Sequence, residues 1–259
     1  MISTDLTINS GDLNHRNCVG YYFARWFDEP FAVAVLNLLD TNSRYALADD
    51  AQDQQHVDYT ETTADGRVVR SDSKVVTRNF PYKDETTSKT NYADVVTVGE
   101  YVLTSSNHPD IISFYYRNRI YQVDYSGFVT KLKPVAVSES EGENNHKQRL
   151  FHYRIVDIHE MESSVRIKDV PHTLSKCYDA AMKILEQTRN FILEIPRATN
   201  DEKRAFYTKV RYDALERMRN DLTDIIYRFN KELQICQNSA VLPEVDVDYG
   251  LTEIYDLLR

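Results

Sequence analysis

The feature that most constrains the fold is a change in the spacing of apolar residues near residue 171. Beyond that point, two apolar stripes recur at helical spacing, the first over 174–195 and the second over 207–236. The second stripe consists of Tyr207, Val210, Ala214, Met218, Leu222, Ile225, Phe229, Leu233 and Cys236, and it advances 29 residues in eight steps, or 3.63 residues per step. Pro196 ends the first helix, and Thr199 with Glu202 has the pattern of a capping box. The sequence therefore predicts a helical hairpin with one long helix.

Before residue 171, apolar and aromatic residues form short β-branched runs between turn residues, as is typical of strands. We expect strands at 21–27, 31–39, 68–76, 93–104, 111–116, 119–125, 128–133 and 149–158. Residues 28–30 separate the first two, and Asp65-Gly66 has the sequence of a tight hairpin turn. Turn residues at 117–118 and 126–127 divide 111–133 into a three-stranded meander. Such short connections predict antiparallel pairing.

Two polar stretches interrupt these runs. Residues 40–65 carry seven acidic residues against one basic residue, Arg44, and are expected to form an exposed loop or a short polar helix. Residues 138–148 contain no aliphatic residue and are expected to form a surface loop.

Together these patterns predict an α+β fold, in which an antiparallel β-rich region precedes a C-terminal helical hairpin. The expected divisions are a β-rich region at 1–170, a helical hairpin packed on it at 171–238, and an acidic tail at 239–259. One composite domain is favoured over two, because no Pro-rich or Gly-rich linker separates Ile158 from Leu174.

Glycine is scarce, and this excludes several enzyme classes. The chain has seven glycines, and no two of them have the spacing of a dinucleotide fingerprint, a phosphate-binding P-loop or a serine elbow. No cofactor is therefore predicted. The three cysteines are far apart and include no C-x-x-C pair, which argues against a disulfide framework and a cysteine zinc site.

The expected compartment is the cytoplasm or nucleus. The first residues lack an apolar signal segment, and no run of 18 apolar residues occurs, so neither secretion nor a membrane span is expected. The net charge of −9 argues against nucleic acid or an anionic membrane and favours a self-repelling monomer or a protein partner with basic patches. The surplus apolar stripe of the long helix makes a second copy of the chain an alternative partner.

Two patterns resemble metal sites without completing them. His159-Glu160 begins the zinc motif H-E-x-x-H, but Ser163 stands at the position of the second histidine. Residues 244, 246 and 248 imitate a calcium loop, but Tyr249 takes the place of its glycine and Tyr255 the place of its bidentate carboxylate. A hydrolase would therefore need a metal site formed only in three dimensions, for which His152 and His159 are the candidates.

Two groups of residues are candidates for binding. Tyr115, Tyr116, Arg117, Arg119 and Tyr121 interleave rings with guanidinium groups, as sheets that stack single-stranded bases do. Tyrosine is equally typical of cross-strand pairs in ordinary sheets. In the acidic tail, Leu251, Tyr255 and Leu258 form a short amphipathic pattern that could dock on a groove or pack as a last helical turn.

The leading functional hypothesis is a non-enzymatic structural or accessory protein that acts through self-association or docking to a larger assembly. Abundant tyrosine, scarce glycine and the absence of a complete reaction motif favour it. A viral or phage origin is a further hypothesis from composition. The alternatives are a subunit in nucleic-acid transactions and a metal-dependent hydrolase.

Overall fold

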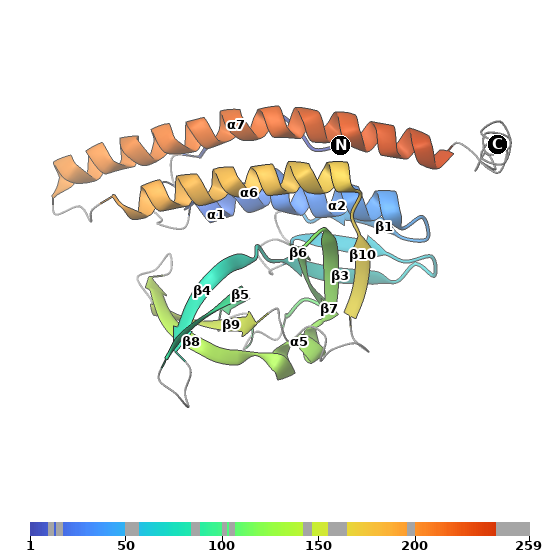
Figure 1. Ribbon diagram of the computed structural model, residues 1–259, viewed down its shortest axis with the longest axis horizontal. Helices are drawn as coiled ribbons and strands as arrows, with labels where there is room; N and C mark the ends of the chain where they lie inside the picture. The colour runs from blue at the N-terminus through green and yellow to red at the C-terminus, as the bar shows by residue number, and fades with distance from the viewer. Residues whose placement is uncertain are drawn as a thin grey trace, which may run out of the picture.

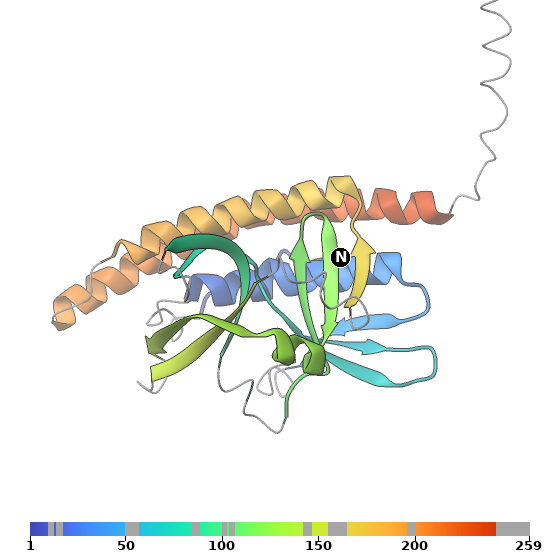
Figure 2. The same cartoon turned by 60° about the horizontal axis from the view of Figure 1, so that its bottom comes forward.

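The computed structural model describes residues 1–9, 13, 18–49, 57–83, 89–99, 103, 107–141, 147–154, 165–195 and 200–241. Helices form one layer and two β-sheets form the other, as Figures 1 and 2 show from two directions. The predicted α+β class is confirmed.

The C-terminal helices form the predicted hairpin, with α6 at His172–Leu193 and α7 at Asp201–Val241. The two helices pack side by side along one edge of the molecule (Figure 1). Most of the predicted stripe on α7 is buried, from Ala214 to Leu233. The start of α7 differs from the predicted capping box of Thr199 and Glu202. The Asn200 side chain accepts a hydrogen bond from the Lys203 backbone N–H at 2.8 Å and so caps the helix.

The strands predicted at 21–27 and 31–39 are wrong, because this stretch is helical. It consists of α1 (Cys18–Phe23), a π-helical segment η2 (Ala24–Asp28) and α2 (Glu29–Leu39). Phe23, Phe27 and Phe31 recur every four residues, and their rings lie 5.9 and 5.7 Å apart in the core. Pro30 stands in the first turn of α2, where its missing N–H costs no hydrogen bond. A short apolar run is compatible with either a strand or a helix. In residues 18–39 the helix forms because it packs the three phenylalanine rings on one buried face.

The long helix α7 is covered by α6, by α2 and by the N-terminal segment. Ile2 and Leu6 are buried in the same apolar cluster as Met218 and Leu222. Asn230 on α7 fixes this segment, because its side-chain amide accepts the Ile2 N–H and donates to the Ile2 carbonyl, both at 2.8 Å.

The larger sheet has six strands in the order β1-β2-β3-β6-β7-β10. They are β1 (Arg44–Leu47), β2 (Tyr59–Thr62), β3 (Val68–Ser73), β6 (Ile111–Tyr116), β7 (Arg119–Asp124) and β10 (Val165–Asp169). A hairpin joins β2 to β3 at Asp65-Gly66 as predicted, but the connection has three residues, 64–66, instead of two. Gly66 has a φ of +81°, and Asp65 does not have a positive φ. Two expectations are wrong: β1 and β2 occupy part of the predicted polar loop 40–65, and β3 pairs with β6 in parallel.

The predicted third strand of the meander is also wrong. Residues 125–131 form α5 (Tyr125–Lys131), whose Phe128 is buried, and β10 takes the place beside β7. The sheet curls strongly, because Arg166 on β10 reaches Glu61 on β2 at 2.9 Å although three strands separate them. Glu61 is buried within β2, although its stretch is predicted from the sequence to be a loop, because its cationic partner lies 105 residues away along the chain.

The smaller sheet has the order β4-β5-β9-β8 and is antiparallel. Its strands are β4 (Thr77–Lys83), β5 (Thr90–Gly99), β8 (Lys133–Glu141) and β9 (Lys147–Arg154). The surface loop predicted at 138–148 is therefore partly wrong, because β8 and β9 extend into it. A second apolar cluster, which includes Val96, Phe114 and Phe128, lies between the two sheets. Within the described part of the chain, no helix has the length and apolarity needed to cross a membrane.

Candidate carboxylate and lysine site

The residues predicted to bind nucleic-acid bases lie at the β6–β7 hairpin. Tyr115, Tyr116 and Tyr121 are only 5%, 8% and 7% exposed, so their rings offer no face for stacking bases. Arg117 is exposed at the turn, and Arg119 pairs with Asp169 at 2.7 Å. The three rings pack inward as ordinary sheet tyrosines, and the predicted binding role of these five residues stays a prediction.

Other predicted candidates fall outside the described residues. These are Leu251, Tyr255 and Leu258 of the acidic tail, together with His159. His152 lies on β9, where its backbone pairs with Thr97 on β5.

A different set of polar residues meets where β3 ends. The β2–β3 register pairs Tyr59 with Ser71, so Asp58, immediately before β2, lies opposite Asp72 near the end of β3. Two residues beyond Asp72 the chain reaches Lys74, whose amide donates to the Ser113 carbonyl of β6 at 2.8 Å. Asp58, Asp72 and Lys74 are called the carboxylate–lysine site below.

The three side chains of this site are close together; Asp58 and Lys74 are partly exposed to solvent, whereas Asp72 is buried. The Ser73 amide donates to Asp58 Oδ2 at 2.6 Å, and Lys74 Nζ donates to Asp72 Oδ1. Asp72 is 1% exposed. Its second oxygen, Oδ2, is buried and accepts no hydrogen bond from an N–H group or a hydroxyl of the described residues. The Asp58 carboxyl group, when protonated, is the hydrogen-bonding neighbour of Asp72. A buried carboxylate oxygen without an N–H or hydroxyl donor is costly and indicates a missing ligand or proton.

The electrostatics of the site favour a proton or a cation between the two carboxylates. Burial and then the negative charge of Asp72 raise the pKa of Asp58 to about 7, although Lys74 and the Ser73 amide oppose them. At pH 7 the Asp58 carboxyl group is therefore about half protonated. A divalent cation carries the charge that would replace that proton.

A third carboxylate reaches the end of β3 from the helical layer. Asp28, the last residue of the π-helical segment, is 2% exposed. Its Oδ2 accepts the Ser73 hydroxyl at 3.0 Å, and its Oδ1 accepts the Tyr178 hydroxyl from α6. Burial raises the pKa of Asp28. Single π-helical turns are frequent at functional sites, and this one fixes the residue between Asp72 and Lys74.

Two carboxylates are the acidic ligands that this site offers to a metal. In the part of the chain that the structure describes, no group of three or more His, Cys, Asp and Glu side chains is arranged around a common metal position. Mg²⁺ typically takes one or two carboxylates and fills its remaining positions with water and substrate phosphate oxygens. Asp58 and Asp72 match that requirement.

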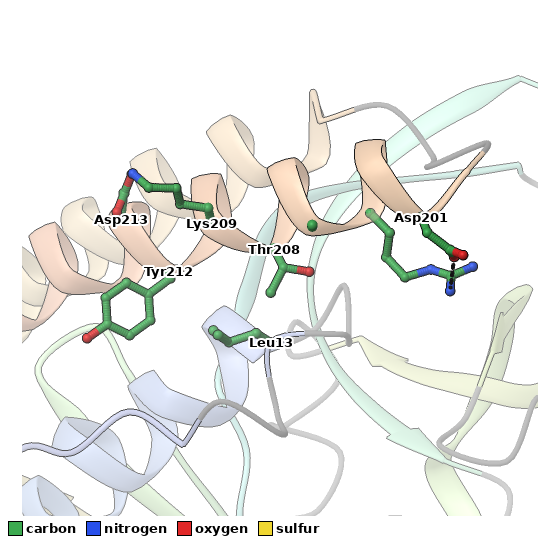
Figure 3. Close-up of a pocket in the computed structure, with 8 residues that line it drawn as sticks. Leu13, Asp201, Thr208, Lys209, Tyr212 and Asp213 are labelled. Atoms are coloured by element: carbon green, nitrogen blue, oxygen red, sulfur yellow. Dashed lines mark hydrogen bonds and ion pairs between the residues drawn. The ribbon is translucent and has the colours of Figure 1, made fainter.

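Two surface clefts contain no comparable arrangement. The cleft in Figure 3 lies between Leu13 and the first turns of α7, and its Lys209 pairs with Asp213 at 3.3 Å. A second cleft, near the start of β3, has Asp110 and Arg166 in its wall, and both are already ion-paired. Asp110 pairs with the partly exposed Arg70, and Arg166 pairs with the buried Glu61.

The sequence contained a signal for the carboxylate–lysine site that motif searching missed. Asp58 and Asp72 each lie seven residues from Asp65, on either side of the Asp-Gly turn. An antiparallel hairpin centred on Asp65, with a three-residue connection at 64–66, places them opposite each other. The following Lys74 is on the same face as Asp72, because side chains alternate along a strand.

Comparisons with known proteins give a partial match. No protein-family model and no solved structure matches the chain. The DNA integrity scanning protein DisA from Thermotoga petrophila and that from Thermotoga maritima are each 30% identical over 97 residues. The match covers 38% of this chain and about a quarter of each relative, 27% and 26% respectively. A match of this extent does not establish membership of their family or an enzymatic activity.

Proposed function

We propose that this protein is a divalent-metal-dependent hydrolase of phosphodiester bonds, with its active centre at the carboxylate–lysine site. The observation that carries the proposal is the buried Oδ2 of Asp72, which accepts no hydrogen bond from an N–H group or a hydroxyl of the described residues. It lies beside Asp58 and two residues from Lys74. A bound metal would satisfy that oxygen and offset the charge of the two carboxylates. This function is the metal-dependent hydrolase named among the alternatives above. Its metal ligands are Asp58 and Asp72, whereas the sequence indicated His152 and His159.

Each residue has a distinct role in this proposal. Asp58 and Asp72 hold the metal, which when bound polarises a phosphoryl oxygen and activates water. Lys74 supplies a compact positive charge that stabilises the extra negative charge on the phosphoryl oxygens during displacement. Asp28 is a positioning residue, because it holds the Ser73 side chain and thereby the backbone between Asp72 and Lys74.

A phosphodiester is the substrate class that this combination of groups fits best. Mg²⁺ held by two carboxylates keeps positions for phosphate oxygens, and a lysine ammonium binds phosphate as a point charge. The matched relatives are named for scanning DNA integrity, which supports DNA as the first substrate to test.

The test is hydrolysis by the full chain after metal removal with EDTA and return of Mg²⁺ or Mn²⁺. Substrates are bis(p-nitrophenyl) phosphate and fluorescent DNA and RNA oligonucleotides. We expect metal-dependent turnover, with kcat/KM lowered at least ~100-fold in Asp58→Asn, Asp72→Asn and Lys74→Ala. Asp221→Asn, an exposed carboxylate change on α7, is the matched control and should retain activity.

Circular dichroism verifies that each variant is folded before it is assayed. Turnover that persists in EDTA, or a folded Asp72→Asn variant with wild-type activity, contradicts the proposal. A wild-type chain that hydrolyses none of these substrates with either metal contradicts it as well.

A second candidate is the non-enzymatic interaction protein, working through self-association or docking. The observation that favours it is the exposure of aromatic side chains on α7, with Tyr227 71% and Phe206 61% exposed. Such rings are common anchors at protein interfaces. Light scattering of wild type, Tyr227→Ala and Phe206→Ala tests this role: a dimer that the substitutions weaken supports it, and a monomer in all three chains contradicts self-association.

A further inference from the structure

Two arginines, Arg78 and Arg117, lie near Tyr116 at the carboxyl end of β6, the strand beside β3. Arg78 is on β4, four residues beyond Lys74, and Arg117 is in the turn between β6 and β7. Because β3 and β6 are parallel and Ser73 pairs with Ser113, the carboxyl ends of both strands share one edge of the sheet. At about 3.3 Å per residue, Arg117 lies roughly 13 Å along β6 from the level of Ser73. This separation is short enough for one substrate chain to reach both places.

The backbone at Arg117 is strained in a way that the residue type does not favour. Arg117 and Asn118 have φ angles of 49° and 63°, the left-handed region that two-residue hairpin turns require. Glycine, asparagine and aspartate suit these positions, whereas arginine pays about 1 kcal/mol or more. The guanidinium lies over the Tyr116 ring, 4.9 Å from its centre, and this cation–π contact holds it at the end of β6.

Arg78 is presented by a second irregularity in the backbone. The β4–β5 register shifts between Thr77 and Phe80, and Asn79 within this bulge has a φ of 52°. Bulges bend a strand and redirect a side chain, and they are frequent beside active sites. Arg78 is exposed, and its partner Asp179 on α6, at 3.3 Å, is exposed as well. Such a surface pair contributes roughly 0–1 kcal/mol, so a phosphate can replace the carboxylate.

One carboxylate ties the two irregularities together. Asp94 on β5 accepts the Asn79 amide at 3.0 Å and the Tyr116 hydroxyl at 2.8 Å. The bulge that carries Arg78 and the hairpin that carries Arg117 are therefore held in a fixed relation. Each arginine is at or next to a residue with a strained, positive φ, and both of these places are held by Asp94. The exposed ion pairs elsewhere on the surface lack this arrangement among the described residues.

We propose that Arg78 and Arg117 hold backbone phosphates of a polynucleotide next to the diester bond cleaved at the carboxylate–lysine site. This inference rests on the proposed hydrolase function and specifies its substrate as a nucleic-acid chain rather than a small diester. Arginine suits the role, because its planar group binds phosphate oxygens through two parallel hydrogen bonds. The contacts are with phosphates, so the inference implies little dependence on base sequence.

The test compares Arg78→Ala, Arg117→Asn and the double variant with Arg204→Ala. Arg204 is a matched control, since it is an exposed arginine paired with Asp201 at 3.0 Å on α7. Asparagine at 117 suits the positive φ, so this variant should be at least as stable as wild type. If Arg117 only maintained the turn, Arg117→Asn would therefore bind oligonucleotides as tightly as wild type.

Binding of DNA and RNA oligonucleotides of one sequence is measured by fluorescence anisotropy in EDTA, over a series of salt concentrations. We expect each arginine lost to weaken binding several-fold and to reduce the slope of log K against log salt concentration by about 1. In the presence of metal, the double variant should show an oligonucleotide KM raised at least 10-fold. Its rate on bis(p-nitrophenyl) phosphate should stay within about twofold of wild type. The DNA and RNA arms identify which chain is the preferred ligand.

The results distinguish the phosphate-binding role of Arg78 and Arg117 from the proposed hydrolase activity. If Arg78→Ala and Arg117→Asn bind and cleave oligonucleotides like Arg204→Ala while Asp72→Asn is inactive, the inference is overturned and the hydrolase remains. If the wild-type chain hydrolyses no diester, the hydrolase is overturned by that assay, whatever the binding series shows. Equal losses on the small diester and the oligonucleotide also overturn the inference, since the arginines would then act on the chemistry itself.

Discussion

At the scale of single residues, the most informative groups are polar ones in the interior. Asp28 and Asp72 are almost completely buried, and Asp58 faces Asp72 across the β2–β3 hairpin. Burying carboxylates costs stability unless a proton, a cation or several donors compensate them. Asp28 has two hydroxyl donors, whereas one oxygen of Asp72 has none among the described residues. That difference distinguishes a structural carboxylate from a candidate ligand.

The raised pKa of Asp58 predicts a pH dependence of stability in the absence of metal. Its pKa is about 7 in the folded protein and near 3.8 in the unfolded chain. The folded state therefore binds a proton that the unfolded chain has released between about pH 4 and pH 7. The stability linked to this proton is present at low pH and is lost as the pH rises through 7, with a limiting slope of about 1.4 kcal/mol per pH unit.

Urea denaturation between pH 5 and pH 8 in EDTA measures this effect. We expect Asp58→Asn to flatten the dependence on pH over that range, because an amide does not titrate. Asp221→Asn on the surface of α7 should leave the slope of the wild type in place. A slope that is the same in Asp58→Asn and wild type would show that other groups control the pH response.

At the scale of elements, local sequence correctly predicted the position of the β2–β3 turn but not the helical state of residues 18–39. The Asp-Gly turn formed where its residues require it, because Gly66 alone in that turn has a positive φ. Residues 18–39 formed a helix although their β-branched and aromatic content favours strands. The periodicity of four in Phe23, Phe27 and Phe31 was the correct signal, and it was obscured by apolar residues on the other faces.

Two glycine substitutions should therefore have opposite effects. Gly66→Ala should lower the free energy of unfolding by about 1 to 2 kcal/mol, since its φ of +81° strains any residue with a Cβ. Gly20→Ala should raise it by up to about 1 kcal/mol, because Gly20 is helical and the new methyl would meet only the end of Arg189 at 3.8 Å. Urea denaturation of both variants decides this. Effects of the same sign would contradict the conformational argument.

At the scale of the whole molecule, the arrangement of the two sheets creates the candidate site. The chain leaves the large sheet after β3, builds β4 and β5 of the small sheet, and returns as β6 parallel to β3. The carboxylate–lysine site lies where the chain passes from one sheet to the other, and Asp28 and Tyr178 close it from the helices. The helical layer and the large sheet therefore meet at this site.

Because the site joins these layers, a metal bound there should stabilise the entire fold. At a metal concentration 100 times its Kd, binding adds about 2.7 kcal/mol to the free energy of unfolding. For a domain of this size, that corresponds to a rise in Tm of about 5–10 °C. Differential scanning calorimetry with Mn²⁺ or Mg²⁺ should show the rise in wild type and its loss in Asp72→Asn. A rise of equal size in Asp72→Asn would place the metal elsewhere.

The sequence by itself determined what depends on neighbours along the chain. The hairpin of α6 and α7 followed from apolar spacing, the end of α6 from Pro196, and the β2–β3 turn from Asp65-Gly66, because helix periodicity and turn chemistry are local properties. The α+β class followed from the same patterns. Tertiary structure alone decided the helical state of residues 18–39 and the parallel pairing of β3 with β6. It also decided the burial of Tyr115, Tyr116 and Tyr121 and the meeting of Asp28 with the end of β3. These features depend on contacts between residues tens of positions apart, and such contacts leave no periodic trace in a single sequence.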